Sequence, residues 1–132
     1  MIPFYVELRP GGTIYEQIVY AATKAMISGQ LRPGDTFPSV RTLTKELKIN
    51  PNTAHKVISY LISAGLLEVF PGTGTVVAKR PGATRAEKTN LLEDELEKLV
   101  VEGKRLGIDL PDILEAVEKH WRRLHRKGGQ PG

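Results

Sequence analysis

Two short helical segments joined by a tight connection constrain the fold of this chain more than any other feature. Ser39, which follows Pro38, is placed to cap the first segment, because a serine oxygen accepts the unpaired N–H groups of a first helical turn. Asn50 and Pro51 start the second segment, with asparagine at the cap and proline at the first helical position. Only residues 48–50 separate the two segments. This order predicts a helix-turn-helix.

The flanking segments supply the other parts of a winged helix-turn-helix. Thr13 and Glu16 have the spacing of a capping box, which predicts the start of an earlier helix that Gly29 ends. After the helix pair, residues 67–70 and 75–78 are rich in strand-forming residues and flank a glycine-bearing turn. They predict a β-hairpin in the place of the wing. The expected fold class is therefore mostly α with a small β-hairpin.

Helix-breaking residues and helical periodicity divide the chain further. Pro81 and Gly82 form the expected hinge, and helical periodicity then predicts helices over about 84–106 and 110–126, the second capped by Asp109. We assign three regions: a winged helix-turn-helix DNA-binding domain over 1–80, a helical dimerisation region over 81–127 and a flexible tail over 128–132.

Composition excludes several classes of protein. The chain of 132 residues is too short for an α/β barrel, which needs roughly 200 residues or more. Cysteine is absent, which excludes disulfides, thiolate metal sites and cysteine nucleophiles. No apolar run approaches the ~18 residues of a membrane span, and the first residues lack the charged-then-apolar layout of a signal peptide. We expect a cytoplasmic protein that does not associate with membranes.

Enzymatic and metal-dependent functions find no support in the sequence. The chain offers no arrangement of a nucleophile beside a base, so we expect no enzyme and no cofactor. His55, His120 and His125 are too scattered to form a metal site. No residue pattern indicates an effector molecule.

Charge is unevenly distributed along the chain. Residues 1–80 carry nine basic and five acidic side chains, residues 81–118 carry five and ten, and residues 119–132 carry five and none. The basic character of residues 1–80 favours a polyanionic partner, although charge alone does not identify that partner as nucleic acid. The acidic surface of 87–118 is expected to face away from DNA. The basic stretch from Lys119 to Lys127 is either a solvated helix end or an accessory phosphate contact.

Polar residues in the first two turns of the second helix of the pair are candidates for contacts with double-stranded DNA. Asn52 and His55 can hydrogen-bond base edges, Thr53 can bond a phosphate or touch a thymine methyl, and Lys56 can neutralise a phosphate. Ser39 and Arg41 begin the preceding helix, where a helix-turn-helix approaches the sugar-phosphate backbone, and Gly72, Thr73 and Gly74 form the wing tip. The alternative is a protein–protein adaptor, but the outward face of this helix carries no apolar anchor.

Several short motifs follow one another along residues 12–80: Ile14-Tyr15-Glu16-Gln17-Ile18, Gly29-x-Leu31-x-Pro33-Gly34-Asp35, Pro38-Ser39-Val40-Arg41-x-Leu43, Asn50-Pro51-Asn52-Thr53 and Gly72-Thr73-Gly74-Thr75-Val76. In this order and at these separations they resemble the GntR family of winged-helix proteins. The Asn-Pro-Asn-Thr helix start and the short remainder resemble its YtrA-type subfamily. The resemblance implies a dimeric bacterial transcription regulator, usually a repressor, and we expect it to bind a palindromic operator.

The resemblance also assigns roles to single residues. It implies that Arg41 contacts DNA and that Asn50, Asn52 and Thr53 form the start of the recognition helix. Gly72 and Gly74 match the wing glycines. Two positions depart from the family: Pro51 replaces a frequent arginine, as in the YtrA type, and His55 stands where arginine is common. Because histidine is mostly neutral near pH 7, we expect DNA binding to weaken as the pH rises.

The two C-terminal helices carry apolar stripes that suit dimerisation. One stripe comprises Leu92, Leu96, Leu99, Gly103 and Leu106, and the other Leu110, Ile113, Leu114, Val117, Trp121 and Leu124. Two such hairpins about a twofold axis would form a small bundle, with Trp121 as a core or interface anchor. Gly103 either permits close helix approach or is a weak point in its helix. The alternative to a homodimer is that the pair packs onto the winged helix of the same chain.

Overall fold

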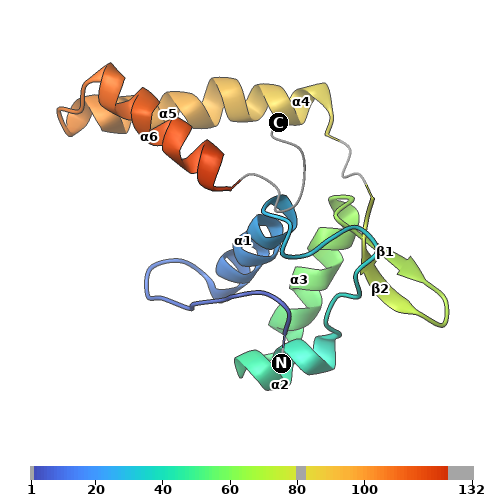
Figure 1. Cartoon of the computed structure of the whole chain (residues 1–132). Helices are drawn as coiled ribbons and strands as arrows, with labels where there is room; N and C mark the ends of the chain where they lie inside the picture. Colours follow the sequence, from blue (N-terminus) through green and yellow to red (C-terminus); the bar gives the residue numbers. More distant parts are fainter. Residues whose placement is uncertain (1, 80–82, 125–132) are drawn as a thin grey trace. The chain divides into compact units, whose positions relative to one another are not determined.

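The computed structural model of the chain describes residues 2–79 and 83–124, which form two compact units divided between these ranges (Figure 1). The expected fold class is confirmed, because the described residues are mostly helical and carry a two-stranded antiparallel hairpin. The expected hinge at Pro81 and Gly82 lies outside the described residues, as does the expected tail over 128–132.

Helix α1 (Ile14–Ile27) begins and ends as its sequence predicts. The Thr13 side chain accepts from the Glu16 amide at 3.0 Å, and the Glu16 carboxylate accepts from the Thr13 amide at 3.4 Å. These reciprocal bonds are the predicted capping box. Gly29 follows the helix with φ of 85°, a left-handed conformation that costs glycine little.

Helices α2 (Val40–Leu47) and α3 (Pro51–Ser63) form the predicted helix-turn-helix. The connection turns at Lys48, which has a left-handed φ of 54° and ψ of 51°. This conformation ends α2 after two turns, and Pro51 at the start of α3 is already restricted to a helical φ. The short connection thus sets the start of α3 directly after α2.

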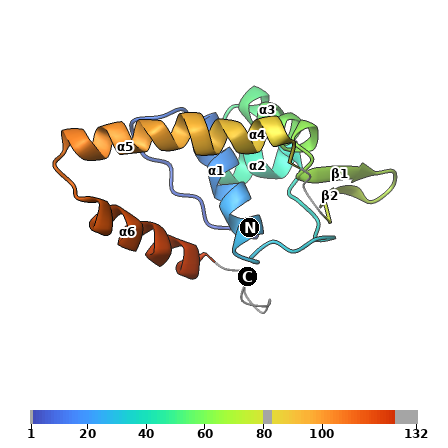
Figure 2. The same ribbon diagram turned by 90° about the horizontal axis from the view of Figure 1, so that it is seen from above.

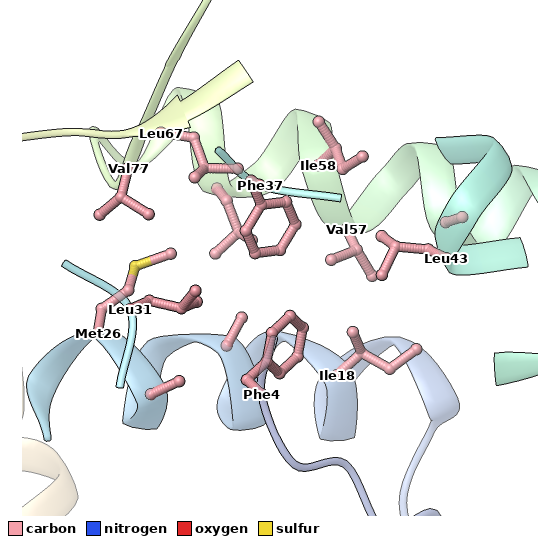
Figure 3. Packing of buried hydrophobic residues seen from close by; sticks show 14 of the residues in the cluster. Phe4, Ile18, Met26, Leu31, Phe37, Leu43, Val57, Ile58, Leu67 and Val77 are labelled. Atoms are coloured by element: carbon pink, nitrogen blue, oxygen red, sulfur yellow. The ribbon is translucent and has the colours of Figure 1, made fainter. Parts of the chain in front are cut away.

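The core of the first unit lies between α1, α2, α3 and the start of the hairpin (Figure 3). Ile18 from α1, Leu43 from α2 and Leu61 from α3 are fully buried. The sequence did not reveal the part played by the N-terminal segment: Phe4 is buried, and its ring stacks on Phe37 with centroids 5.6 Å apart.

The wing is an antiparallel hairpin of β1 (Leu67–Phe70) and β2 (Gly74–Val77). The expected second strand over 75–78 is wrong by one residue at each end, because Phe70 pairs with Gly74 and the turn shortens accordingly. A segment before α2 attaches the wing to the helices: the Phe37 amide donates to the Thr75 carbonyl at 2.8 Å, and Thr36 forms a bridge with Val76.

The second unit is a helical hairpin (Figure 2). Its first arm comprises α4 (Arg85–Thr89), the π-helical segment η1 (Asn90–Glu95) and α5 (Leu96–Arg105), and α6 (Leu110–Arg123) runs back from the turn at an angle to this arm. The prediction of one regular helix over 84–106 is wrong within η1. The residues flanking η1 keep α-helical dihedral angles, so the chain continues without a break and a periodic pattern gives no sign of the change.

The start of α6 matches its prediction only in position. Asp109 is the residue before the helix, but its side chain makes no capping hydrogen bond. The helix ends at Arg123, and the remainder of the predicted range over 125–126 lies outside the described residues. Within the two described ranges, no helix is both long enough and apolar enough to cross a membrane.

Candidate nucleic-acid interface

The first two turns of α3 separate an apolar face from a polar one. Ala54 and Val57 are fully buried in the core, whereas Asn52, His55 and Lys56 are exposed. Thr53 is half-buried between the two faces. The structure therefore brings the predicted recognition residues together on the outer side of one helix, where no other element of the described first unit covers them.

Ser39 and Asn50 perform structural roles at helix starts. The Ser39 hydroxyl oxygen accepts from the Thr42 amide at 3.1 Å, and Asn50 Oδ1 accepts from the Asn52 amide at 2.7 Å. Both residues are exposed. Capping uses the carboxamide oxygen of Asn50 and leaves its Nδ2 group available as a donor. Each residue can thus support its helix and still meet a phosphate.

His55 lies on the exposed face with one ring nitrogen engaged. Its Nδ1 atom is 3.4 Å from the Ser59 hydroxyl oxygen, one helical turn further along α3. The Nε2 atom has no hydrogen-bonding partner in the described part of the chain. This leaves one nitrogen of His55 for an outside partner, fewer than the five donors that an arginine side chain would offer.

Positive charge gathers on the helix-turn-helix. Residues 40–63 contain four basic side chains and one acidic one, a net charge of +3. Arg41 is exposed, and no ion pair among the described residues includes it. Arg9 differs, because its Nε lies 2.8 Å from Glu7 Oε2, and that hydrogen bond lowers the pKa of the Glu7 carboxyl below its ordinary value.

The wing tip combines open space with left-handed backbone. Gly72 has φ of 81° and Gly74 has φ of 102°, and a Cβ atom added to either would have no heavy atom within 4 Å among the described residues. Glycine is therefore required by the backbone conformation and not by crowding. Thr73 between them is exposed, and its amide donates to the Phe70 carbonyl at 3.0 Å.

The sequence did not predict two exposed residues of this region. Lys48 adds a positive charge at the turn between α2 and α3. This charge is the feature by which the sequence could have identified Lys48 as a candidate site residue. Tyr60 corrects the expectation that the outward face of α3 has no large apolar side chain: it is 44% exposed, and its ring meets Tyr15 edge-on with centroids 6.2 Å apart. The tertiary contact with α1 has no signature in local sequence.

The predicted dimerisation residues lie in the second unit and are largely uncovered there. Leu92, Leu96, Leu99, Leu106, Leu114, Val117 and Trp121 are exposed within residues 83–124. Gly103 is buried, and a Cβ atom on it would lie 2.8 Å from Ile113 Cδ1. The close approach expected at Gly103 therefore occurs between α5 and α6 of one chain. Residues 2–79 and 83–124 contain no group of three or more potential metal-ligating side chains.

Comparison with known proteins adds independent findings. A family model described as "Bacterial regulatory proteins, gntR family" matches residues 14–77. The chain is 30% identical over 115 residues to the HTH-type transcriptional repressor YtrA of Bacillus subtilis, an alignment that covers 86% of this chain and 88% of that protein.

Solved structures share the fold. The transcriptional antiterminator from Listeria monocytogenes EGD-e superposes with a TM-score of 0.81 at 22% identity, covering 98% of this chain and 97% of that one. A GntR family transcriptional regulator from Listeria monocytogenes has a TM-score of 0.64 at 25% identity, covering 85% and 98% respectively. The likeness to the first structure supports the fold alone.

Proposed function

The chain belongs to the gntR family of bacterial regulatory proteins and is a DNA-binding transcription regulator, and we propose that it is a repressor that binds a palindromic operator as a homodimer. It is not an enzyme. The observation that carries the proposal is the exposed polar start of α3, together with an exposed Arg41 on α2 that no ion pair among the described residues includes. A slim helix with hydrogen-bonding side chains in its first turns matches the width of the major groove.

The proposed site residues fall into two groups, those that contact base edges and those that contact phosphates. Asn52 and His55 read base edges, because an amide and an imidazole nitrogen can each complement the donors and acceptors of a base pair. Ser39, Arg41 and Lys56 meet phosphates. These contacts set the position of α3 in the groove but carry no sequence information.

Further phosphate and groove contacts flank the base-reading residues. Asn50 donates to a phosphate through Nδ2 while Oδ1 caps α3, and Thr53 bonds a phosphate or touches a thymine methyl. The wing tip of Gly72, Thr73 and Gly74 follows the adjacent groove, where the absence of two side chains allows close approach of the backbone.

The homodimer is supported by the exposed apolar residues of 83–124. Leaving so many leucines uncovered is unfavourable, since each buried leucine side chain contributes about 1.5–3 kcal/mol. A twofold dimer presents two copies of α3 related by the same symmetry, which requires an inverted repeat in the DNA. Repression is supported by the likeness to the transcriptional repressor YtrA of Bacillus subtilis. Such a regulator works in the cytoplasm, beside bacterial DNA.

Selection of bound duplexes from a random pool tests the proposal. The full chain is expected to enrich an inverted repeat whose half-sites lie about one helical turn apart, or a multiple of it. Footprinting of the enriched sequence and a reporter assay with the operator over a promoter then measure occupancy and repression. Enrichment of no sequence, or of a single unrepeated half-site, contradicts the proposal, and increased reporter output contradicts repression alone.

A further inference from the structure

The turn at the end of the wing is conformationally restrained. The Thr73 amide donates to the Phe70 carbonyl at 3.0 Å, which closes a four-residue turn. Pro71 is its second residue and Gly72, with φ of 81°, is its third, which is the residue pattern of a type II turn. Because the proline ring fixes one backbone angle and the hydrogen bond restrains the others, binding at this turn costs little conformational entropy.

Apolar side chains are exposed at the same end of the wing. Phe70 is 47% exposed and Val69 is 59% exposed, and Pro71 is exposed as well. Side chains alternate between the two faces of β1, so Val69 shares the face of Leu67, which is buried in the core, and Phe70 lies on the opposite face. The residue that pairs with Phe70 across the hairpin is Gly74, which has no side chain to cover the ring. The ring of Phe70 is therefore open to an outside partner.

The wing carries no positive charge that could attract a phosphate. Residues 67–78 contain one acidic side chain, Glu68, and no basic one, whereas residues 40–63 of the helix-turn-helix have a net charge of +3. Side chains without a cation neutralise no phosphate, so the wing gains affinity for DNA only through apolar contacts and neutral hydrogen bonds. Phe70 offers the largest apolar side chain for such a contact.

The place of the wing beside α3 directs it to the minor groove. Only residues 64–66 separate β1 from α3, and the Ala78 amide donates to the Leu66 carbonyl at 3.0 Å, which ties the end of β2 to the same connection. The two grooves of B-DNA alternate along the duplex, so an element beside a helix in the major groove meets the minor groove. This groove is about 6 Å wide and the strands of a hairpin lie about 4.8 Å apart, so a ring beside the hairpin enters only where the groove widens.

From these features we propose that the ring of Phe70 enters the minor groove beside each half-site and selects DNA that widens or kinks there. The inference rests on the proposed function and adds a specificity-determining residue to it. Phenylalanine and proline side chains can part neighbouring base pairs from the minor-groove side. Pyrimidine–purine steps such as TA deform easily, whereas A-tracts are stiff. Phe70 thus distinguishes sequences through their flexibility, without a hydrogen bond to a base.

Substitution of Phe70 in the full chain tests this contact. The probes are duplexes of the inverted repeat enriched by selection, in which each step beside the half-sites is changed in turn to TA or to AA. The wild type is expected to prefer TA about tenfold at one step beside each half-site, and Phe70→Ala is expected to bind both duplexes alike. The salt slope of Phe70→Ala is expected to stay within about 0.5 of the wild-type value, because no phosphate contact is lost.

Two further variants separate a contact with DNA from an effect on folding. Phe70→Thr keeps a strand-forming residue at the position, so the hairpin is expected to remain while the preference for TA is lost as in Phe70→Ala. Val69→Ala is the matched control, because it truncates the neighbouring exposed side chain on the other face of β1, and it is expected to keep the wild-type preference. Circular dichroism and thermal unfolding check that each variant is folded.

The outcomes distinguish this inference from the proposed function. Equal affinity of the wild type for TA and AA at every step overturns the contact of Phe70, and so does a preference that survives in both Phe70 variants or is lost equally in Val69→Ala. Each of these results leaves the inverted repeat and its regulator in place. Enrichment of no sequence by the wild type instead overturns the proposed function itself.

Discussion

Arg41→Ala gives the sharpest test of the proposed phosphate contacts. The side chain is exposed and unpaired among the described residues, and alanine is a good helix former, so α2 is expected to remain folded. Each neutralised phosphate contributes about 0.9 to the slope of log affinity against log salt. A homodimer carries two copies of Arg41, so the slope is expected to fall by about 1.8.

The size of the effect can be worked through for a common salt range. Between 50 and 200 mM salt, a slope difference of about 1.8 corresponds to roughly a twelvefold smaller loss of affinity for the variant than for the wild type. Fluorescence anisotropy with a labelled duplex at several salt concentrations measures both slopes. The affinity of the variant falls on operator and random DNA alike, because a phosphate contact carries no sequence information.

Arg9→Ala is the matched control for this measurement. It removes the same side chain, but Arg9 is paired with Glu7 at 2.8 Å and lies outside the proposed interface. The control is expected to leave the salt slope unchanged. If Arg9→Ala and Arg41→Ala change the slope equally, or if Arg41→Ala leaves it within about 0.5 of the wild-type value, the assignment of Arg41 to a phosphate is refuted.

Three further substitutions test base reading, charge and assembly. Asn52→Ala is expected to reduce discrimination between operator and random duplexes by ~1–3 kcal/mol in competition binding, and equal losses on both DNAs contradict base reading. His55→Arg is expected to raise DNA affinity, because a guanidinium adds a positive charge and five donors where the imidazole has one ring nitrogen left for an outside partner; an unchanged affinity removes His55 from the interface. Leu99→Asp is expected to give monomers in sedimentation and loss of binding to inverted repeats, whereas a surviving dimer places the interface elsewhere.

The elements that the sequence predicts best are those whose causes are local. Thr13, Ser39 and Asn50 each bond an amide two or three residues ahead, so the residue type and a short spacing suffice to identify the helix start. The order of helix, turn, helix and hairpin follows from these starts and from the glycines that end the segments. The candidate DNA-contacting face of α3 follows as well, because burial of one stripe leaves the opposite one exposed.

The features that the sequence does not reveal depend on contacts between distant segments. Phe4 is buried against Phe37 although the N-terminal segment has no periodic pattern, because a single ring can fill a gap in the core from an extended chain. The one-residue shift of β2 follows from the pairing of Phe70 with Gly74, and the bridge between Thr36 and Val76 joins the wing to a segment far away in the sequence. Tyr60 on α3 meets Tyr15 on α1, a contact that neither helix indicates alone.

Ser39 and Asn50, which cap α2 and α3, serve both the stability of the helix-turn-helix and its proposed contacts with DNA. Ser39 and Asn50 accept backbone hydrogen bonds that hold the first turns of α2 and α3, and both lie exposed at the positive ends of their helices. A phosphate near these ends would meet free amide groups and a spare side-chain donor without any rearrangement of the caps. In the proposed complex, the groups that define where each helix begins are the same groups that contact the DNA backbone. These shared groups would hold α3 at a defined register on the double helix although α2 has only two turns.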